Sequence, residues 1–192
     1  MKSGMNISLQ KTIENYVPRD EQEEKDKRQM LTFIDGFDDV LTRNNTLGHF
    51  TASAFVVNKD KTKMLTVYHT ISDGWAHPGG HADGEEDLLS VAVRETKEET
   101  GIDANVLSRK PFLLTTNPVG GHIKHGEYVS SHIHFDVFYL MEADDAAPLI
   151  FRKDESKGVR WIPFDKIDSE PIAYSIKPVV NKLISSLAEF RG

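Results

Sequence analysis

Cysteine is absent from the 192 residues of this chain. Its absence excludes disulfide bonds, a thiolate nucleophile and a zinc site built on cysteine. A long apolar run is also missing. The N-terminus, MKSGMNISLQKT, lacks the hydrophobic segment of a secretory signal, and no stretch approaches the length needed to span a membrane. We therefore expect a cytoplasmic protein with no membrane partner.

Positive charge is outnumbered, because 23 Lys and Arg face 30 Asp and Glu and the formal net charge is −7 at pH 7. Binding to a phosphate backbone needs a basic surface, so this balance argues against a nucleic-acid partner. It does not argue against nucleotides, because a bound metal ion can meet their charge. The hydrophobic content of 39 % supports a real core, and the length fits one domain or one domain with an extension.

Three glutamates form the most informative pattern in the chain. Glu95, Glu98 and Glu99 are spaced i, i+3 and i+4, which places three carboxylates on one side of a helix. Like charges in this arrangement destabilise a bare helix, and Arg94 with Lys97 cannot neutralise all of them. The cluster makes physical sense if it holds a cation. Carboxylate oxygens are hard ligands, so we expect Mg²⁺ or Mn²⁺ rather than zinc.

The segment around these glutamates, GHADGEEDLLSVAVRETKEETGI at residues 80–102, has a defined spacing of glycines and charges. It resembles the Nudix box of the Nudix hydrolase family at every fixed charged and glycine position. The matching residues are Gly80, Glu86, Arg94, Glu95, Glu98, Glu99 and Gly101, followed by Ile102. Thr96 is the one departure, because the pattern prefers an aliphatic residue there, although a threonine methyl can still pack.

The resemblance implies a fold and a set of metal ligands. The fold is a Nudix-like α/β/α sandwich with a mixed sheet, in the α/β class. Glu98 and Glu99 would be the principal metal ligands, and the Gly80 carbonyl would be a third. Glu95 would be a ligand or the general base.

The reaction implied is hydrolysis by a Nudix-type pyrophosphohydrolase. It would cleave a diphosphate bond in a nucleoside diphosphate linked to another moiety, X, so the partner is a small nucleotide-type molecule. In this interpretation Arg94 orients Glu98, and Glu86 supports the site. The identity of X is set outside the box and is not predicted.

Two other functions compete with hydrolysis. Isoprenoid diphosphate isomerisation, an activity of the same superfamily, is disfavoured. Its known members rely on a catalytic cysteine, and this chain has none. A Nudix-fold sensor that binds a nucleotide without hydrolysing it stays as the alternative. Such sensors often have eroded boxes and an attached DNA-binding domain, whereas the box here is intact.

We expect residues 1–47 to form a helical hairpin extension and residues 48–192 to form the Nudix hydrolase domain. The hairpin would either cover part of the core or serve as a dimerisation or substrate-selecting element. The second alternative is compatible with a homodimer. A long mobile loop is predicted at 116–130 and an amphipathic helix at 176–190. Strands are predicted at 51–57, 64–69, 105–115, 131–141 and 159–162.

Two helices are predicted within the N-terminal extension. The first has apolar residues at helical spacing over 9–17. The second opens with a capping box formed by Asp20 and Glu23 and would continue to Asn44.

Polar and aromatic residues outside the box are candidates for substrate binding. His132, His134 and Asp136 alternate along one strand and share a face. A metal site formed by these three alone is disfavoured, because the first and last would lie about 13 Å apart along a flat strand. Hydrogen bonding to a phosphate or base, or a structural role, is expected for the histidines instead. Trp75 would either stack on a nucleobase or lie in the core.

Further carboxylates could supply an additional acid, base or metal ligand. Asp154 and Glu155 precede the strand at 159–162, where some Nudix enzymes place an extra acidic residue. Glu127, in the glycine-rich loop, is a rival candidate for the general base.

Overall fold

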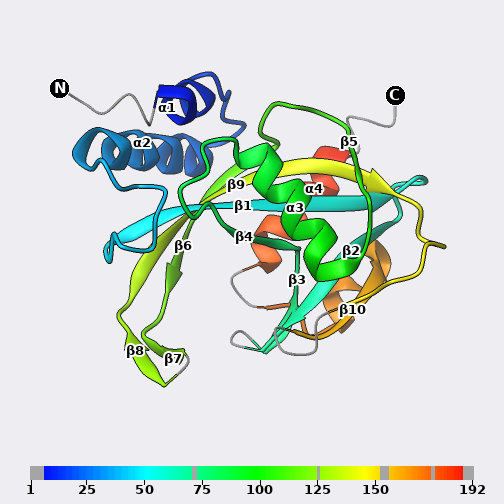
Figure 1. Cartoon of the computed structure of the whole chain (residues 1–192). Helices are drawn as coiled ribbons and strands as arrows, with labels where there is room; N and C mark the ends of the chain where they lie inside the picture. The colour runs from blue at the N-terminus through cyan, green and yellow to red at the C-terminus, as the bar shows by residue number, and fades with distance from the viewer. Residues whose placement is uncertain (1–6, 71–72, 125, 152–155, 174–175, 188–192) are drawn as a thin grey trace. The chain divides into compact units, whose positions relative to one another are not determined.

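The computed structural model describes residues 7–70, 73–124, 126–151, 156–173 and 176–187. It is an α/β protein with a large mixed sheet and helices (Figure 1), which confirms the class expected from the sequence. In chain order its elements are α1 (Ile7–Glu14), α2 (Glu21–Gly36), β1 (Gly48–Asn58), β2 (Lys63–His69), β3 (Gly74–Ala76), β4 (Gly79–His81), α3 (Leu88–Thr100), β5 (Asn105–Val106), β6 (Leu113–Val119), β7 (His122–Lys124), β8 (Glu127–Val129), β9 (His132–Ala143), β10 (Ser156–Pro163), the 3₁₀ helix η2 (Phe164–Ser169) and α4 (Lys177–Leu187).

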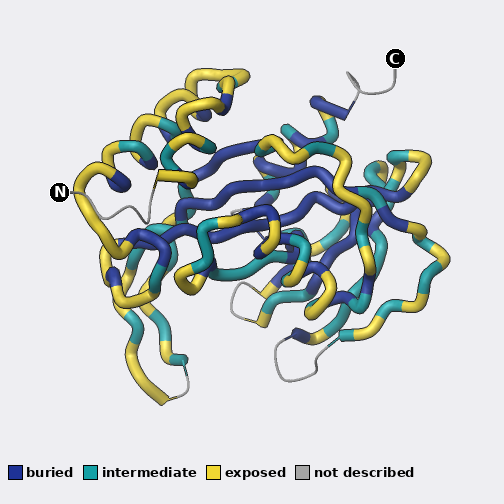
Figure 2. Tube along the Cα trace, turned by 45° about the horizontal axis from the view of Figure 1, so that its top comes forward, coloured by how far each residue is buried: buried dark blue, intermediate teal, exposed yellow. Residues whose placement is uncertain are grey.

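Within the described ranges, eight strands form one sheet. Hydrogen bonds join five of them in the order β10-β2-β1-β9-β5, while β3 pairs with β2, β4 with β1 and β6 with β9. β7 and β8 form a separate two-stranded sheet. Every residue of β1 is buried, and so is most of β9 (Figure 2). A strand buried throughout needs small or apolar side chains, and the β1 sequence GHFTASAFVVN supplies mainly these.

The chain divides into two compact units, each assembled from three segments. Unit 1 comprises Met1–Ala52, Gly80–Val91 and Ser108–Tyr139, and unit 2 comprises Ser53–Gly79, Ala92–Leu107 and Leu140–Gly192. The division falls within α3, so each unit contains part of the box. The expected boundary between residues 47 and 48 stays a prediction.

In unit 1, the predicted N-terminal helices are held by buried polar contacts. The Asp20 carboxylate caps α2 by accepting from the Glu23 backbone N–H at 2.9 Å, as the capping pattern predicts. The Tyr16 hydroxyl donates to the buried Glu23 carboxylate at 2.7 Å. The Asp26 carboxylate accepts from the Thr116 hydroxyl at 2.8 Å and from its N–H at 3.3 Å, which joins α2 to β6. The same helices bury Leu9, Ile13, Met30, Phe33 and Ile34.

The predicted end of the second helix is wrong. α2 ends at Gly36, and Phe37 is already in an extended conformation. Glycine is a poor helix former, so the helix is weakest at this position. Beyond it, Val40 is fully buried and its carbonyl accepts from the Phe50 N–H at 2.8 Å. The apolar residues after Gly36 therefore pack as an irregular segment beside the start of β1, although their spacing suggested a helix.

The prediction of a single strand at 105–115 is also wrong. The structure has two strands there, β5 at its start and β6 from Leu113 onward. Between them the Ser108 hydroxyl accepts from the Lys110 N–H at 3.1 Å, forming a tight turn just before Pro111. Proline cannot donate a ladder hydrogen bond, so the turn and the proline together interrupt the strand.

The segment predicted as a loop at 116–130 contains strand structure. β6 continues to Val119, which lies opposite His132 of β9, and β7 and β8 pair with each other. Pro118 lies within β6 opposite Ile133. β6 pairs with β9 alone among the named strands, so the missing N–H of this proline is tolerated at an edge. The turn residues obscured this pairing in the sequence.

Unit 2 contains predicted elements that the structure confirms. β2 pairs antiparallel with β10, where Val67 lies opposite Val159, and with β3, where Tyr68 lies opposite Trp75. The C-terminal helix is confirmed over its described part, α4. Its buried apolar residues are Val179, Val180, Leu183 and Leu187. No helix in the described part of the chain is long and apolar enough to cross a membrane.

Replacing the α2 cap tests how far the N-terminal helices depend on it. We expect Asp20→Ala to lower the free energy of unfolding by about 1 kcal/mol, because the Glu23 N–H loses its acceptor. Asp20→Asn is the matched control, since asparagine caps helices about as well as aspartate. Urea denaturation followed by circular dichroism measures both variants. Equal stability of Asp20→Ala and the unmodified protein would contradict the capping role.

Candidate active site

The helix α3 has a core face that fixes its orientation. Leu88, Leu89, Val91 and Ala92 are buried, and so are Thr96 and Thr100. The Thr96 hydroxyl donates to the Ala92 carbonyl at 2.7 Å, so the hydroxyl is satisfied within the helix while the methyl packs. Threonine is therefore compatible with the position where the box pattern prefers an aliphatic residue.

The carboxylates of α3 differ in their exposure and partners. The Arg94 guanidinium lies 2.6 Å from the Glu95 carboxylate and 3.9 Å from that of Glu98. The Glu95 side chain is 18 % exposed and that of Glu98 is 48 % exposed. Arg94 was expected to orient Glu98, but its shorter contact is with Glu95. Glu98 is the more accessible carboxylate of the two.

Glu99 is held by the backbone that leads into the box. Its carboxylate accepts from the Gly79 N–H at 2.9 Å. The preceding Pro78 carbonyl accepts from the Ala54 N–H of β1 at 2.9 Å, so this segment is itself anchored. A carboxylate fixed by a backbone donor keeps one orientation. This contact restricts where the Glu99 oxygens lie within unit 2.

The end of α3 requires a glycine for two reasons. Gly101 has φ +76°, a left-handed conformation typical of the residue after a helix. A Cβ there would also lie 2.9 Å from Cβ of Ile150, whose N–H donates to the Thr100 carbonyl at 2.9 Å. Any other residue would strain the backbone and displace Ile150.

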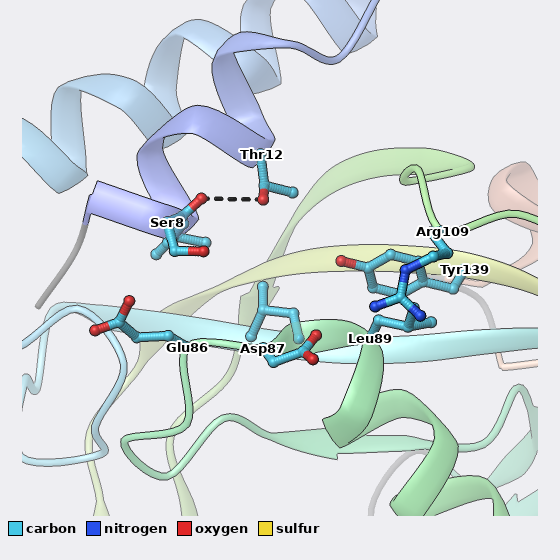
Figure 3. Close-up of a pocket in the computed structure, with 9 residues that line it drawn as sticks. Ser8, Thr12, Glu86, Asp87, Leu89, Arg109 and Tyr139 are labelled. Carbon is cyan, nitrogen blue, oxygen red and sulfur yellow. Dashed lines mark hydrogen bonds between the residues drawn. The ribbon is translucent and has the colours of Figure 1, made fainter.

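The first part of the box lies in unit 1. Gly80 is in β4, and Glu86 is half-buried in the turn before α3. Glu86 lines a cavity of about 300 Å³ (Figure 3), with Arg109 beside Tyr139 at its other end. The full lining is Ser8, Leu9, Thr12, Glu86, Asp87, Leu88, Leu89, Arg109 and Tyr139. Residues of α1 thus share a cavity with the start of the box. The supporting role of Glu86 and the ligand role of the Gly80 carbonyl stay predictions.

The histidines of β9 have partners that the sequence did not reveal. The structure brings His132 and His134 together with His49 of β1, with one ring nitrogen from each lying within 4.8 Å of the others. The ring of His81 is 5.0 Å from that of His49 and 5.0 Å from that of His134, measured between centroids. Asp136 is buried on the same strand but is not part of this group. No local motif marks His49 or His81, because the contacts are formed by tertiary structure.

His49, His81 and His134 are poor bases, although only His49 is fully buried. Burial, with smaller contributions from the neighbouring His81 and His49, lowers the pKa of His134 to about 2. Burial likewise lowers the pKa of His81 to about 3, with the next contribution from His49. The pKa of His49 is also lowered by burial, and the Asn45 backbone opposes this shift in part. All three imidazoles are therefore neutral at pH 7.

Trp75 packs against a cation in unit 2. The Arg160 guanidinium lies 4.2 Å from the centroid of the Trp75 ring, a cation–π contact. Tyr68 meets the same ring edge-on, with the centroids 5.1 Å apart. Arg160 covers one face of the indole. Stacking of a nucleobase on Trp75 stays a prediction.

The remaining candidates lie outside the clusters described above. Glu127 is exposed on β8, opposite Lys124 in the β7–β8 ladder. Asp154 and Glu155 lie outside the described residues. Their roles as an extra acid, base or ligand stay predictions.

Comparisons with known proteins agree with the box and the fold. A family model described as NUDIX domain matches residues 48–183. The asymmetrical bis(5'-nucleosyl)-tetraphosphatase of Rattus norvegicus is 33 % identical over 111 residues, covering 56 % of this chain and 69 % of that protein. The RNA pyrophosphohydrolase of Sphingopyxis alaskensis is 28 % identical over 105 residues, covering 52 % and 66 %. The m7GpppN-mRNA hydrolase of Saccharomyces cerevisiae is 25 % identical over 136 residues, which are 70 % of this chain and 13 % of that protein.

Solved structures support the fold. A Nudix hydrolase from M. smegmatis superposes with a TM-score of 0.54 at 17 % identity, covering 78 % of this chain and 94 % of that one. A NUDIX-family hydrolase from Clostridium perfringens has a TM-score of 0.50 at 22 % identity, covering 72 % and 97 %. The family model spans well over half of the sequence. The chain therefore belongs to the Nudix family and is an enzyme of the Nudix pyrophosphohydrolase type.

Proposed function

We propose that this protein is a divalent-metal-dependent hydrolase that cleaves a diphosphate bond in a nucleoside diphosphate linked to another moiety, X. The observation that carries the proposal is the acidic side of α3, where Glu95, Glu98 and Glu99 occupy the box positions. Relatives named as a tetraphosphatase and as an RNA pyrophosphohydrolase support cleavage at a phosphate anhydride.

The residues of α3 fit a magnesium ion by donor chemistry. Mg²⁺ prefers oxygen ligands, keeps several waters and is usually bound by one or two carboxylates together with substrate phosphates. Convergence of three carboxylates is therefore not required. Glu98 has an accessible carboxylate, and Glu99 has one held in place by the Gly79 N–H. We assign these two as the principal ligands of Mg²⁺ or Mn²⁺.

Charged neighbours on α3 stabilise the carboxylates of this site. Arg94 contacts Glu95 closely and Glu98 at longer range, so it offsets part of the repulsion between neighbouring carboxylates. Glu95, the less exposed of the pair, serves as a further ligand or as the base that accepts a proton from the attacking water. When bound, the metal polarises phosphate oxygens and lowers the pKa of a coordinated water.

The substrate class follows from charge and from the reaction. A net charge of −7 disfavours a long nucleic acid, whereas a small nucleotide brings a few negative charges that the metal can offset. A panel of dinucleoside tetraphosphates, nucleotide sugars, nucleoside triphosphates and 5'-triphosphorylated RNA, each with Mg²⁺ and with Mn²⁺, tests this. Identification of the released products distinguishes hydrolysis from binding alone, and binding without products would overturn the proposal.

Glu98→Gln tests the metal-ligand assignment. We expect hydrolysis to fall by at least about 100-fold, because loss of a direct ligand costs no less than loss of a residue that supports one. Lys97→Gln is the matched control on the same helix, since Lys97 pairs with Asp103 at the surface. Initial rates are measured over a range of Mg²⁺ concentrations. Undiminished hydrolysis by Glu98→Gln would rule out the assignment.

Arg94→Gln tests whether the cation positions the carboxylates. We expect kcat to fall by about 10- to 100-fold, because Glu95 and Glu98 lose the group that orients them. The Mg²⁺ concentration for half-maximal rate should not rise, since removing a positive charge strengthens attraction for a cation. Arg94→Lys keeps the charge and should recover part of kcat. An unchanged kcat in Arg94→Gln would show that Arg94 has no positioning role.

A further inference from the structure

Unit 1 contains a cluster of three histidines that share no residue with the acidic side of α3. It consists of His49 on β1 and of His132 and His134 on β9, and is called the histidine cluster below. One ring nitrogen of each residue lies within 4.8 Å of the others. Among the described residues, this is the one group of three or more histidine and carboxylate side chains close enough to share a metal ion.

The backbone brings these residues together at the start of both strands. The Ile133 N–H donates to the Leu47 carbonyl at 3.0 Å. A Cβ on Gly48 would lie 2.8 Å from the Ile133 carbonyl oxygen, so the approach of the two segments requires glycine. Side chains alternate along a strand, so His132 and His134 lie on one face of β9 and Ile133 lies on the other. The cluster is thus built on hydrogen-bonded backbone rather than on a free loop.

Hydrogen bonding fixes the tautomer of His132. Its Nδ1 donates to the Ser130 carbonyl at 2.8 Å, which leaves a lone pair on Nε2 in the neutral ring. Metal-binding histidines commonly donate their second ring N–H to a backbone carbonyl in this way. The Nε2 atoms of His132 and His134 lie 3.1 Å apart and share a hydrogen bond, in which the lone pair of His132 Nε2 accepts from His134. Ligand nitrogens around a tetrahedral zinc lie about 3.3 Å apart, given zinc–nitrogen distances of about 2.0–2.1 Å.

His49 supplies an independent indication of a ligand. It is only 4 % exposed. Neither of its ring nitrogens has a hydrogen-bond partner of normal geometry within the described part of the chain, and the Asn45 backbone, which acts on one side of the ring, can satisfy at most one of the two nitrogens. A buried polar group without such a partner is costly, and a coordinated ion would satisfy it. The burial of His49 and the geometry of the two β9 histidines therefore both indicate a bound metal ion.

We propose that His49, His132 and His134 form a binding site for a borderline transition metal of the Zn²⁺ class. Imidazole nitrogens suit zinc, copper and nickel, whereas Mg²⁺ requires oxygen ligands. The site therefore selects a different ion from the carboxylates of α3 and does not depend on the proposed function. Three protein ligands leave a fourth position for water or another molecule, beside the ring of His81.

Zinc binding by the full-length protein tests the site. Excess Mg²⁺ occupies the carboxylates, and bound Zn²⁺ per chain is then measured after desalting, with affinity obtained by competition against a chromogenic chelator. We expect one zinc per chain. The dissociation constant should rise by at least about 100-fold in His132→Gln and in His134→Gln, because each loses a direct ligand. Zinc should raise the melting temperature of the unmodified protein and not that of these variants.

Matched variants separate this site from other histidines and from the acidic side of α3. His69→Gln removes a half-buried histidine of β2, and Glu98→Gln removes a carboxylate of α3, and both should retain zinc. His132 is partly exposed, so His132→Gln keeps the test valid if substitution of the buried His49 prevents folding. Absence of bound zinc in the unmodified protein would overturn the proposal. So would His132→Gln and His134→Gln variants that bind zinc as tightly as the unmodified protein does. Retention of zinc only when Glu98 is intact would overturn it as well.

Discussion

Mutual repulsion among the carboxylates of α3 is the constraint around which the acidic part of the box is organised. Three like charges on one side of a helix oppose its formation, so other interactions must hold the helix. The threonines of the core face are buried with their hydroxyls bonded along the helix. Arg94 offsets part of the charge, and the Gly79 N–H holds Glu99. The helix is therefore stabilised by its buried face and its ends, which leaves the acidic side available for a cation.

The two groups of potential ligands differ in hardness and in hydration. The Glu98 carboxylate is half-exposed and charged, which suits an ion that keeps waters and bridges to phosphate. In the histidine cluster, burial lowers the pKa of His49 and of His134, so these two imidazoles are neutral nitrogen donors, which suits an ion that accepts nitrogen ligands. One chain thus offers separate environments for two classes of metal.

Local patterns were predictable from the sequence, and contacts between distant segments were not. The box, the cap at Asp20 and the strand that became β9 each depend on residues close together in the chain. His49 joins His132 across more than eighty positions, and no periodicity marks such a contact. The same limit explains why the end of α2 was predicted wrongly. The apolar spacing continues past Gly36, but the Val40 carbonyl accepts from the distant Phe50 N–H, a contact that the local pattern does not show. The strands at 113–129 were hidden by proline and glycine, which signalled turns although β9 provided a partner for β6.

The contacts of the N-terminal helices with β6 have a consequence for how this part of the molecule opens. Thr116 of β6 has its hydroxyl and its N–H bonded to the Asp26 carboxylate. The Phe112 carbonyl, just before β6, accepts from Arg19, whose guanidinium also lies 4.4 Å from the Phe112 ring centroid. Separation of the helices would leave these polar groups without their partners and the aromatic ring uncovered. The helices and the strand thus belong to one cooperative folding unit, and fluctuations that expose one expose the other.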